Sequence, residues 1–122
     1  TTQWEFSIAP YTSFPAGLTV GADGVIYVPA HLYASGGTYQ DKGRVIALNP
    51  DGSQKWLFSV GPTDQSSGIA WGTTAPAIAA DGTLYLGIHQ SLYALTSDSL
   101  GLAASPWPKI YNNNRNTNRA GN

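Results

Sequence analysis

One phrase occurs twice in this chain, and it restricts the possible folds more than any other feature of the sequence. Ala22-Asp23-Gly24-Val25-Ile26-Tyr27-Val28 returns as Ala80-Asp81-Gly82-Thr83-Leu84-Tyr85-Leu86. Each copy is followed by an apolar run that ends in Ala-Leu, at residues 45–48 and 92–95. A phrase that recurs at such spacing is typical of one supersecondary unit used more than once, so we expect a repeat protein.

Three Asp-Gly pairs, at residues 23–24, 51–52 and 81–82, predict tight turns between strands. Asp-Gly adopts the positive φ angles of a two-residue hairpin turn at little steric cost. Around these pairs the apolar residues alternate with a period of two, and β-branched and aromatic residues dominate, which favours strands. The sequence lacks the apolar spacing of an amphipathic helix, so we expect almost no helix.

The predicted strands form two units. The first comprises residues 17–21, 25–30, 44–48 and 54–60, and the second comprises residues 76–79, 83–88 and 91–96, with 100–104 as a degenerate fourth strand. A polar, glycine-rich loop at residues 34–43 separates the second and third strands of the first unit. Without that loop the repeat has a period of about 47 residues, which is the length of a four-stranded β-propeller blade.

The expected fold is therefore all-β, with four-stranded antiparallel blades of an incomplete β-propeller. Residues 4–8 contain Trp4-Glu5-Phe6-Ser7, which resembles Trp56-Leu57-Phe58-Ser59 and predicts the outer strand of a preceding blade. Residues 17–60 form one blade, 75–104 a second blade, and 105–122 a closing segment with a polar tail. Closed propellers contain about four to eight blades. We therefore expect copies of this chain, other protein chains or further blades to cover the open blade faces.

These residues resemble the pyrroloquinoline-quinone-like (PQQ-like) propeller repeat, in which an Asp-Gly turn, a Tyr-containing strand and a strand ending in Ala-Leu precede a Trp. Residues 47–56 are similar to the tryptophan-docking motif of that family, which implies that Trp56 packs against a neighbouring blade. In the second unit Ser97-Asp98-Ser99 replaces the Asp-Gly turn, and residues 105–109 are similar to the segment that closes many such propellers. The resemblance implies a radial propeller but not quinone binding.

Composition excludes several classes of partner. The net charge is −1 and charged residues make up 11% of the chain, so no overall field would attract nucleic acid. No apolar run approaches the roughly 18 residues of a membrane span, and we expect no membrane insertion. The chain has no cysteine, which fits an extracytoplasmic protein, whether periplasmic, on the cell surface or secreted.

The aromatic residues are the first candidates for a binding site. Trp4, Trp56, Tyr27 and Tyr85 could stack on sugars or on a flat cofactor, but we expect them to fill blade cores and the seams between blades. Trp71 lies just before an innermost strand, and in the resembling family that connection faces the central funnel where ligands bind. Packing in a seam is the expected role of Trp71 as well.

The polar candidates carry no recognisable catalytic or metal-binding pattern. His31 and His89 follow the second strand of each unit, but no carboxylate or further histidine recurs beside them to complete a metal site. The Asp-Gly pairs lack the spacing of calcium loops, and no nucleophile motif appears. Residues 112–119 carry two arginines, too few for strong phosphate binding, and predict a solvated tail or a strap. We expect no catalytic, cofactor-binding or metal-binding residues.

These observations predict a non-catalytic, extracytoplasmic propeller module that acts as a scaffold or protein-interaction subunit, with the loop at residues 34–43 available for recognition. One alternative is a fragment of a PQQ-dependent quinoprotein dehydrogenase that uses calcium. Against it, the blades offer only Lys42, Arg44 and Lys55 as cations, and the vicinal cysteine pair of those enzymes is missing. The other alternative is a carbohydrate-binding propeller that uses Trp71 and exposed tyrosines.

Overall fold

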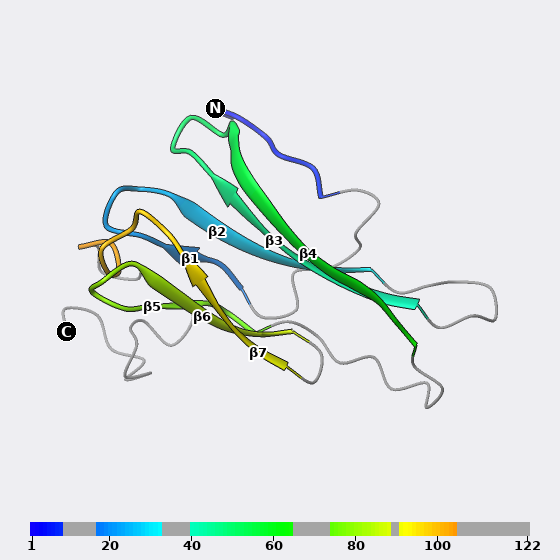
Figure 1. Cartoon of the computed structure of the whole chain (residues 1–122). Coiled ribbons are helices and arrows are strands. Elements are labelled where there is room, and N and C mark those ends of the chain that lie inside the picture. Colours follow the sequence, from blue (N-terminus) through cyan, green and yellow to red (C-terminus); the bar gives the residue numbers. More distant parts are fainter. Residues whose placement is uncertain (9–16, 33–39, 65–73, 89–90, 105–122) are drawn as a thin grey trace.

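The chain folds into two antiparallel β-sheets that lie one above the other (Figure 1). The computed structural model describes residues 1–8, 17–32, 40–64, 74–88 and 91–104, and every structural statement below concerns these residues. The first sheet has four strands in chain order: β1 (Thr19–Val20), β2 (Ile26–Leu32), β3 (Gln40–Leu48) and β4 (Gln54–Asp64). The second has three, also in chain order: β5 (Ala77–Ile78), β6 (Thr83–Ile88) and β7 (Ser91–Thr96). The described part of the chain contains no helix, so the all-β prediction is confirmed there.

The strands follow the predicted order but differ from it in length. β6 and β7 have the predicted bounds, whereas β1 and β5 have only two residues each. Residues 40–43, which we expected in a loop, belong to β3, and β4 extends to Asp64. The backbone of Gly43 pairs with His31 of β2, and a bulge between Asp41 and Gly43 accommodates the polar residues in the ladder.

One face of each sheet forms a common hydrophobic core, which we call the seam. It is built from alternate residues of the strands, because side chains one residue apart point to opposite faces. The buried residues of the seam are Val25, Tyr27, Val45 and Ala47 in the first sheet and Ile78, Leu84, Leu86 and Ile88 in the second. Trp56, Phe58, Tyr93 and Leu95 pack around them.

The opposite, outer face of the first sheet has its own smaller cluster. Val28, Ile46 and Leu48 are buried there, and Phe6 and Ile8 of the N-terminal segment pack on them. Residues 1–8 lie on the far side of the first sheet from the second sheet (Figure 1). They form no strand, although the sequence predicts one at residues 4–8. As no described strand runs beside this segment, its backbone has no ladder to join.

The segment that follows β7 does not add the degenerate fourth strand expected at residues 100–104. Leu102 instead makes an isolated antiparallel bridge with Gly21, at the end of β1. The N–H of Ala103 donates to the carbonyl of Val20, and that of Ala22 donates to the carbonyl of Gly101. The chain thus crosses from the second sheet to the first, and the second sheet is left with β7 as an edge strand in the described structure.

Candidate functional site

All three Asp-Gly pairs form the same loop, but it has three residues rather than the predicted two. In the β1–β2 connection Gly21 N–H donates to Val25 O and Gly24 N–H donates to Gly21 O, both at 2.9 Å. The same pair of bonds recurs around residues 50–52 and 80–82. The glycines have φ angles of 81°, 87° and 90°. A tight turn followed by a left-handed glycine is the usual geometry of a three-residue hairpin loop.

The aspartate of each loop stabilises its own turn. Its carboxylate accepts the backbone N–H two residues further on, from Val25 at 3.2 Å, Ser53 at 2.9 Å and Thr83 at 2.9 Å. The Ser53 hydroxyl and N–H lower the pKa of Asp51, and the backbone N–H of Thr83 does the same for Asp81. Within the described residues no group of three or more His, Cys, Asp or Glu side chains is placed to hold a metal ion.

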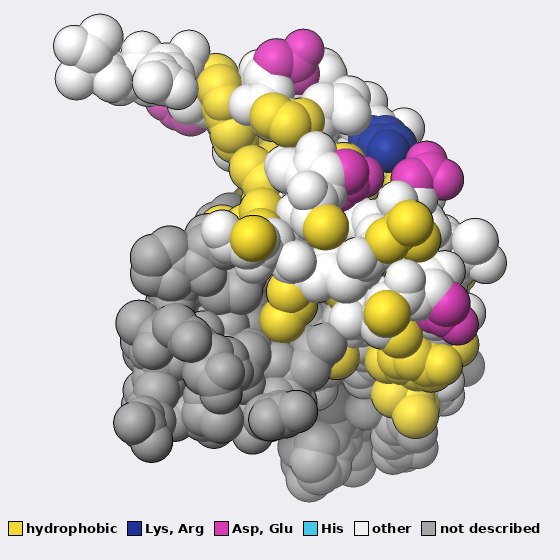
Figure 2. Space-filling view, turned by 90° about the vertical axis from the view of Figure 1, so that its left-hand side faces the viewer, with side chains coloured by type: hydrophobic (Ala, Val, Ile, Leu, Met, Phe, Trp, Pro, Cys, Tyr) yellow, Lys and Arg dark blue, Asp and Glu magenta, His cyan; other side chains and the backbone are white. Residues whose placement is uncertain are grey.

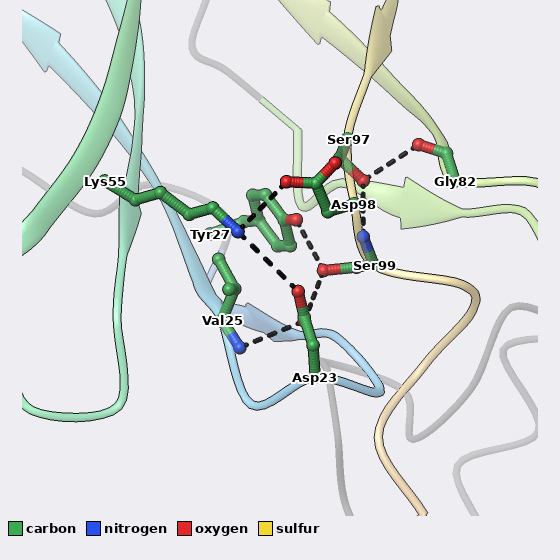
Figure 3. A network of polar contacts seen from close by, with 8 residues as sticks. All are labelled: Asp23, Val25, Tyr27, Lys55, Gly82, Ser97, Asp98 and Ser99. Carbon is green, nitrogen blue, oxygen red and sulfur yellow. Dashed lines mark hydrogen bonds and ion pairs between the residues drawn. The ribbon is translucent and has the colours of Figure 1, made fainter.

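Asp23 also joins a network of polar side chains at the edge of the seam (Figure 3). Ser99 Oγ donates to Asp23 Oδ1 at 2.5 Å and lies 2.6 Å from the hydroxyl of Tyr27. Because the single proton of Ser99 goes to the carboxylate, the Tyr27 hydroxyl is the donor in its own bond. Burial alone would raise the pKa of Asp23, but the bonds from Ser99 and Val25, together with the nearby Lys55, lower it.

Lys55 and Ser97 complete this junction network. The Lys55 ammonium lies 3.9 Å from Asp23 Oδ2 and 3.3 Å from Asp98 Oδ2, so it bridges the first sheet to the segment after β7. Ser97 Oγ donates to the carbonyl of Gly82 at 2.8 Å. Figure 2 views this end of the molecule and shows a basic side chain beside acidic ones. Tyr27 and Ser99 are fully enclosed, so this part of the network fastens the two sheets together.

The sequence analysis missed the two serines of this network. It treated Ser97-Asp98-Ser99 as a decayed Asp-Gly turn, whereas both hydroxyls are buried and hydrogen-bonded. The available signal was their position, because they replace Pro50 and Gly52 of the first unit on both sides of an aspartate.

The first open surface is an apolar pocket on the outer face of the first sheet. Its volume is about 390 Å³ and its lining residues are Trp4, Phe6, Leu18, Ile26, Val28 and Leu48. The indole Nε1 of Trp4 donates to the carbonyl of Pro50 at 3.0 Å, which fixes the ring over the β3–β4 turn. Even so, 38% of Trp4 is exposed, so the pocket is only partly covered.

The second open surface is the outer face of the second sheet. Leu92 is 77% exposed and Tyr85 is 44% exposed, and Ala94 lies between them in the register of the sheet. Tyr85 thus lies outside the core and the seam of the described chain, and its expected place between blades stays a prediction. A contiguous apolar surface on an edge-containing sheet is typical of an interaction site.

The other predicted aromatic residues lie in the seam or against the first sheet. The rings of Tyr27 and Trp56 are 5.8 Å apart and tilted by 49°. Phe58 of β4 meets Tyr93 of β7 edge-on at 5.4 Å. The expectation that Tyr27 and Trp56 pack between two sheets is therefore confirmed.

Several predicted candidates fall outside the described residues. These are Trp71, His89, most of the loop at residues 34–43 and the tail at residues 105–122. His31 is placed only as a backbone partner of Gly43 in β2. Their suggested roles stay predictions.

The described residues contain no helix that could cross a membrane. No protein-family model, no curated protein and no solved structure matches this chain.

Proposed function

We propose that the chain is a non-catalytic β-propeller module that serves as a scaffold or protein-interaction subunit outside the cytoplasm. One observation carries the proposal. Among the described residues the second sheet has three strands where the first has four, and its edge strand β7 carries the exposed Leu92 next to Tyr85 of β6. The absence of cysteine fits that location.

The relation between the two sheets supports their assignment as blades. Aligning the two copies of the repeated phrase makes Tyr27 equivalent to Tyr85, Ala47 to Ala94 and Leu48 to Leu95. Tyr27 and Ala47 lie in the seam, whereas Tyr85 and Ala94 lie on the outer face of the second sheet. The sheets therefore stack head to tail, with the Tyr-Ala face of one against the Leu face of the next. Radially arranged blades stack in the same way.

The uncovered edge of β7 defines how a partner would bind. An extended segment that pairs with an edge strand gains backbone hydrogen bonds, and its alternate side chains gain contacts with one face of the sheet. In the first sheet the corresponding strand, β4, places Trp56 opposite Ala47 and Phe58 opposite Val45. A partner strand on β7 would place aromatic side chains opposite Ala94 and Leu92.

A peptide copied from β4 tests this proposal. Residues 53–59, Ser-Gln-Lys-Trp-Leu-Phe-Ser, would carry a fluorescent label, and anisotropy would report binding to the intact chain at low concentration. We expect saturable binding that weakens by about tenfold or more when serine replaces both aromatic residues, or when the chain carries Leu92→Asp. The variant Leu100→Asp, at another exposed leucine beyond β7, is the matched control.

Absence of binding, or equal binding of both peptides, would contradict the proposal. Quenching of tryptophan fluorescence by PQQ with Ca²⁺ would instead favour the quinoprotein alternative, and a saturable response to sugars would favour the carbohydrate alternative. Trp71, on which the carbohydrate alternative depends, lies outside the described residues, and both alternatives stay predictions. Fractionation of the source cells tests the location.

A further inference from the structure

We infer that the partner of the open edge is a second copy of this chain, whose residues 4–7 supply the fourth strand to the second sheet of its neighbour. The inference rests on the proposed function, since it assumes that both sheets are blades. It adds the identity of the occupant and the register in which that occupant binds.

The chain carries a segment with the sequence of the missing strand. Trp4-Glu5-Phe6-Ser7 repeats the spacing of Trp56-Leu57-Phe58-Ser59. In β4 the Trp and Phe of this pattern share the face that lies in the seam. The second sheet lacks such a strand in the described structure, while the segment that matches it is not part of any sheet.

The N-terminal segment already lies where such a strand would have to be. Trp4 and Phe6 line the outer pocket of the first sheet together with Leu48. Trp56 and Phe58 line a pocket of about 290 Å³ together with Leu95, the residue equivalent to Leu48. Residues 4–7 therefore contact the first sheet as β4 contacts the second. They occupy the position of the fourth strand of a preceding blade.

That strand cannot reach the second sheet of its own chain without leaving its site. Phe6 packs on the outer face of the first sheet, and the seam lies on the opposite face of the same sheet. The first sheet thus separates the donor segment from the acceptor edge (Figure 1). The second sheet of the same copy therefore cannot meet the donor in place, whereas the second sheet of another copy can.

The acceptor edge offers Trp4 the same kind of neighbours that Trp56 has in the first sheet. Tyr27 and Trp56 both pair with Ala47, and this small residue lets their rings approach to 5.8 Å. Tyr85 pairs with Ala94 in the same way but has no tryptophan beside it in the described structure. Pairing Trp4 with Ala94 and Phe6 with Leu92 would rebuild that aromatic contact. It would cover three of the exposed side chains, namely Trp4, Tyr85 and Leu92.

The contact between copies would lack the junction network. When the repeats are aligned, Gly52 takes the position of Ser99 and Gln3 takes the position of Lys55 in the contact between copies. Trp4 lies over Gly52, and a Cβ there would overlap the indole ring, so a serine is not accommodated. We therefore expect the contact between copies to be weaker than the seam and to depend little on salt.

Each copy then has one donor segment and one acceptor edge. Because these two surfaces differ, the contact between copies is head to tail rather than two-fold symmetric. Such contacts close into a ring when the rotation allows it. Because closed propellers have about four to eight blades, we expect rings of about two to four copies.

Two complementary variants test the inference. The donor variant is Trp4→Asp, and the acceptor variant is Tyr85→Asp with Leu92→Asp. Light scattering after size-exclusion chromatography should give a wild-type mass of two to four times 12.9 kDa at high concentration, and 12.9 kDa for each variant alone. A mixture of the two variants should form a dimer, because one intact donor and one intact acceptor remain.

One control variant, Leu100→Asp, carries the same charge at an exposed site outside the contact, and it should assemble like the wild type. Circular dichroism checks that every variant is folded, and Phe6→Asp serves as a second donor variant. A wild type that stays at 12.9 kDa, or a mixture that stays monomeric, overturns the inference. If the β4 peptide still binds to that monomer, the proposed function stands and another chain or a further repeat is the occupant.

Discussion

Tyr27 and Tyr85 occupy the same place in the two copies of the repeat, but their surroundings are opposite. Both follow an aspartate loop in the second strand of a sheet, and both pair with an alanine. Tyr27 is 1% exposed and hydrogen-bonded to Ser99, whereas Tyr85 is 44% exposed. The comparison shows that the repeated sequence determines the strand and the turn, whereas the sheet packed against a strand determines whether its tyrosine is buried.

The largest difference should appear when each tyrosine is truncated. We expect Tyr27→Ala to lower the free energy of unfolding by about 3–5 kcal/mol, because it leaves a cavity in the seam. Tyr85→Ala should change it by about 1 kcal/mol or less in the monomer, since 44% of that residue is exposed. Denaturant unfolding at low protein concentration measures both values. Equal losses would show that Tyr85 is also enclosed.

A smaller difference should separate the buried and exposed serines of the turns. In Ser99→Ala the Tyr27 hydroxyl loses its hydrogen-bond acceptor and the Asp23 carboxylate loses one hydrogen-bond donor. The substitution should therefore lower the free energy of unfolding by about 1–3 kcal/mol. Ser53→Ala removes an exposed hydroxyl that bonds Asp51, and it should cost about 0.5 kcal/mol or less. Thermal unfolding of both variants provides the measurement. A neutral Ser99→Ala would mean that the junction network does not stabilise the seam.

The smallest effect should appear in the pH dependence. The pKa of Asp23 is lowered in the folded protein from its usual 3.8, so the unfolded chain binds more protons in acid. The stability due to this group is therefore complete above 3.8 and is lost as the pH falls through the lowered pKa.

Unfolding free energies measured between neutral pH and acid should accordingly fall less steeply for Asp23→Asn than for the wild type. Asp81→Asn serves as the comparison, because Asp81 occupies the equivalent turn without the bonds to Ser99 and Lys55. We expect its effect on the slope to be smaller. Identical slopes for the two variants would contradict the role given to the network.

Local features of the fold were predictable from the sequence. The Asp-Gly pairs and the period-two pattern locate all seven described strands to within about four residues at each end, because a strand beside a tight turn depends on its own residues. The extension of β3 through residues 40–43 was not predictable, since backbone pairing with β2 and β4 outweighs their polar composition. The three-residue loops were missed because Asp-Gly fits both loop lengths.

Features that depend on distant segments were not predictable. The crossing of residues 100–104 to Gly21 requires the close approach of Ser99, which the missing side chain of Gly21 permits. The burial of Ser97 and the exposure of Tyr85 likewise depend on which surface lies opposite. The pocket around Trp4 could be suspected only from the likeness of residues 4–7 to β4.

The head-to-tail stacking of the two sheets has a consequence for how such a chain can change in length. The two ends of the stack expose different surfaces, and these surfaces match those that meet inside. Duplication of one unit in the gene would therefore insert another sheet without altering the chemistry at either end. Growth of the array by whole units requires no new contact to evolve.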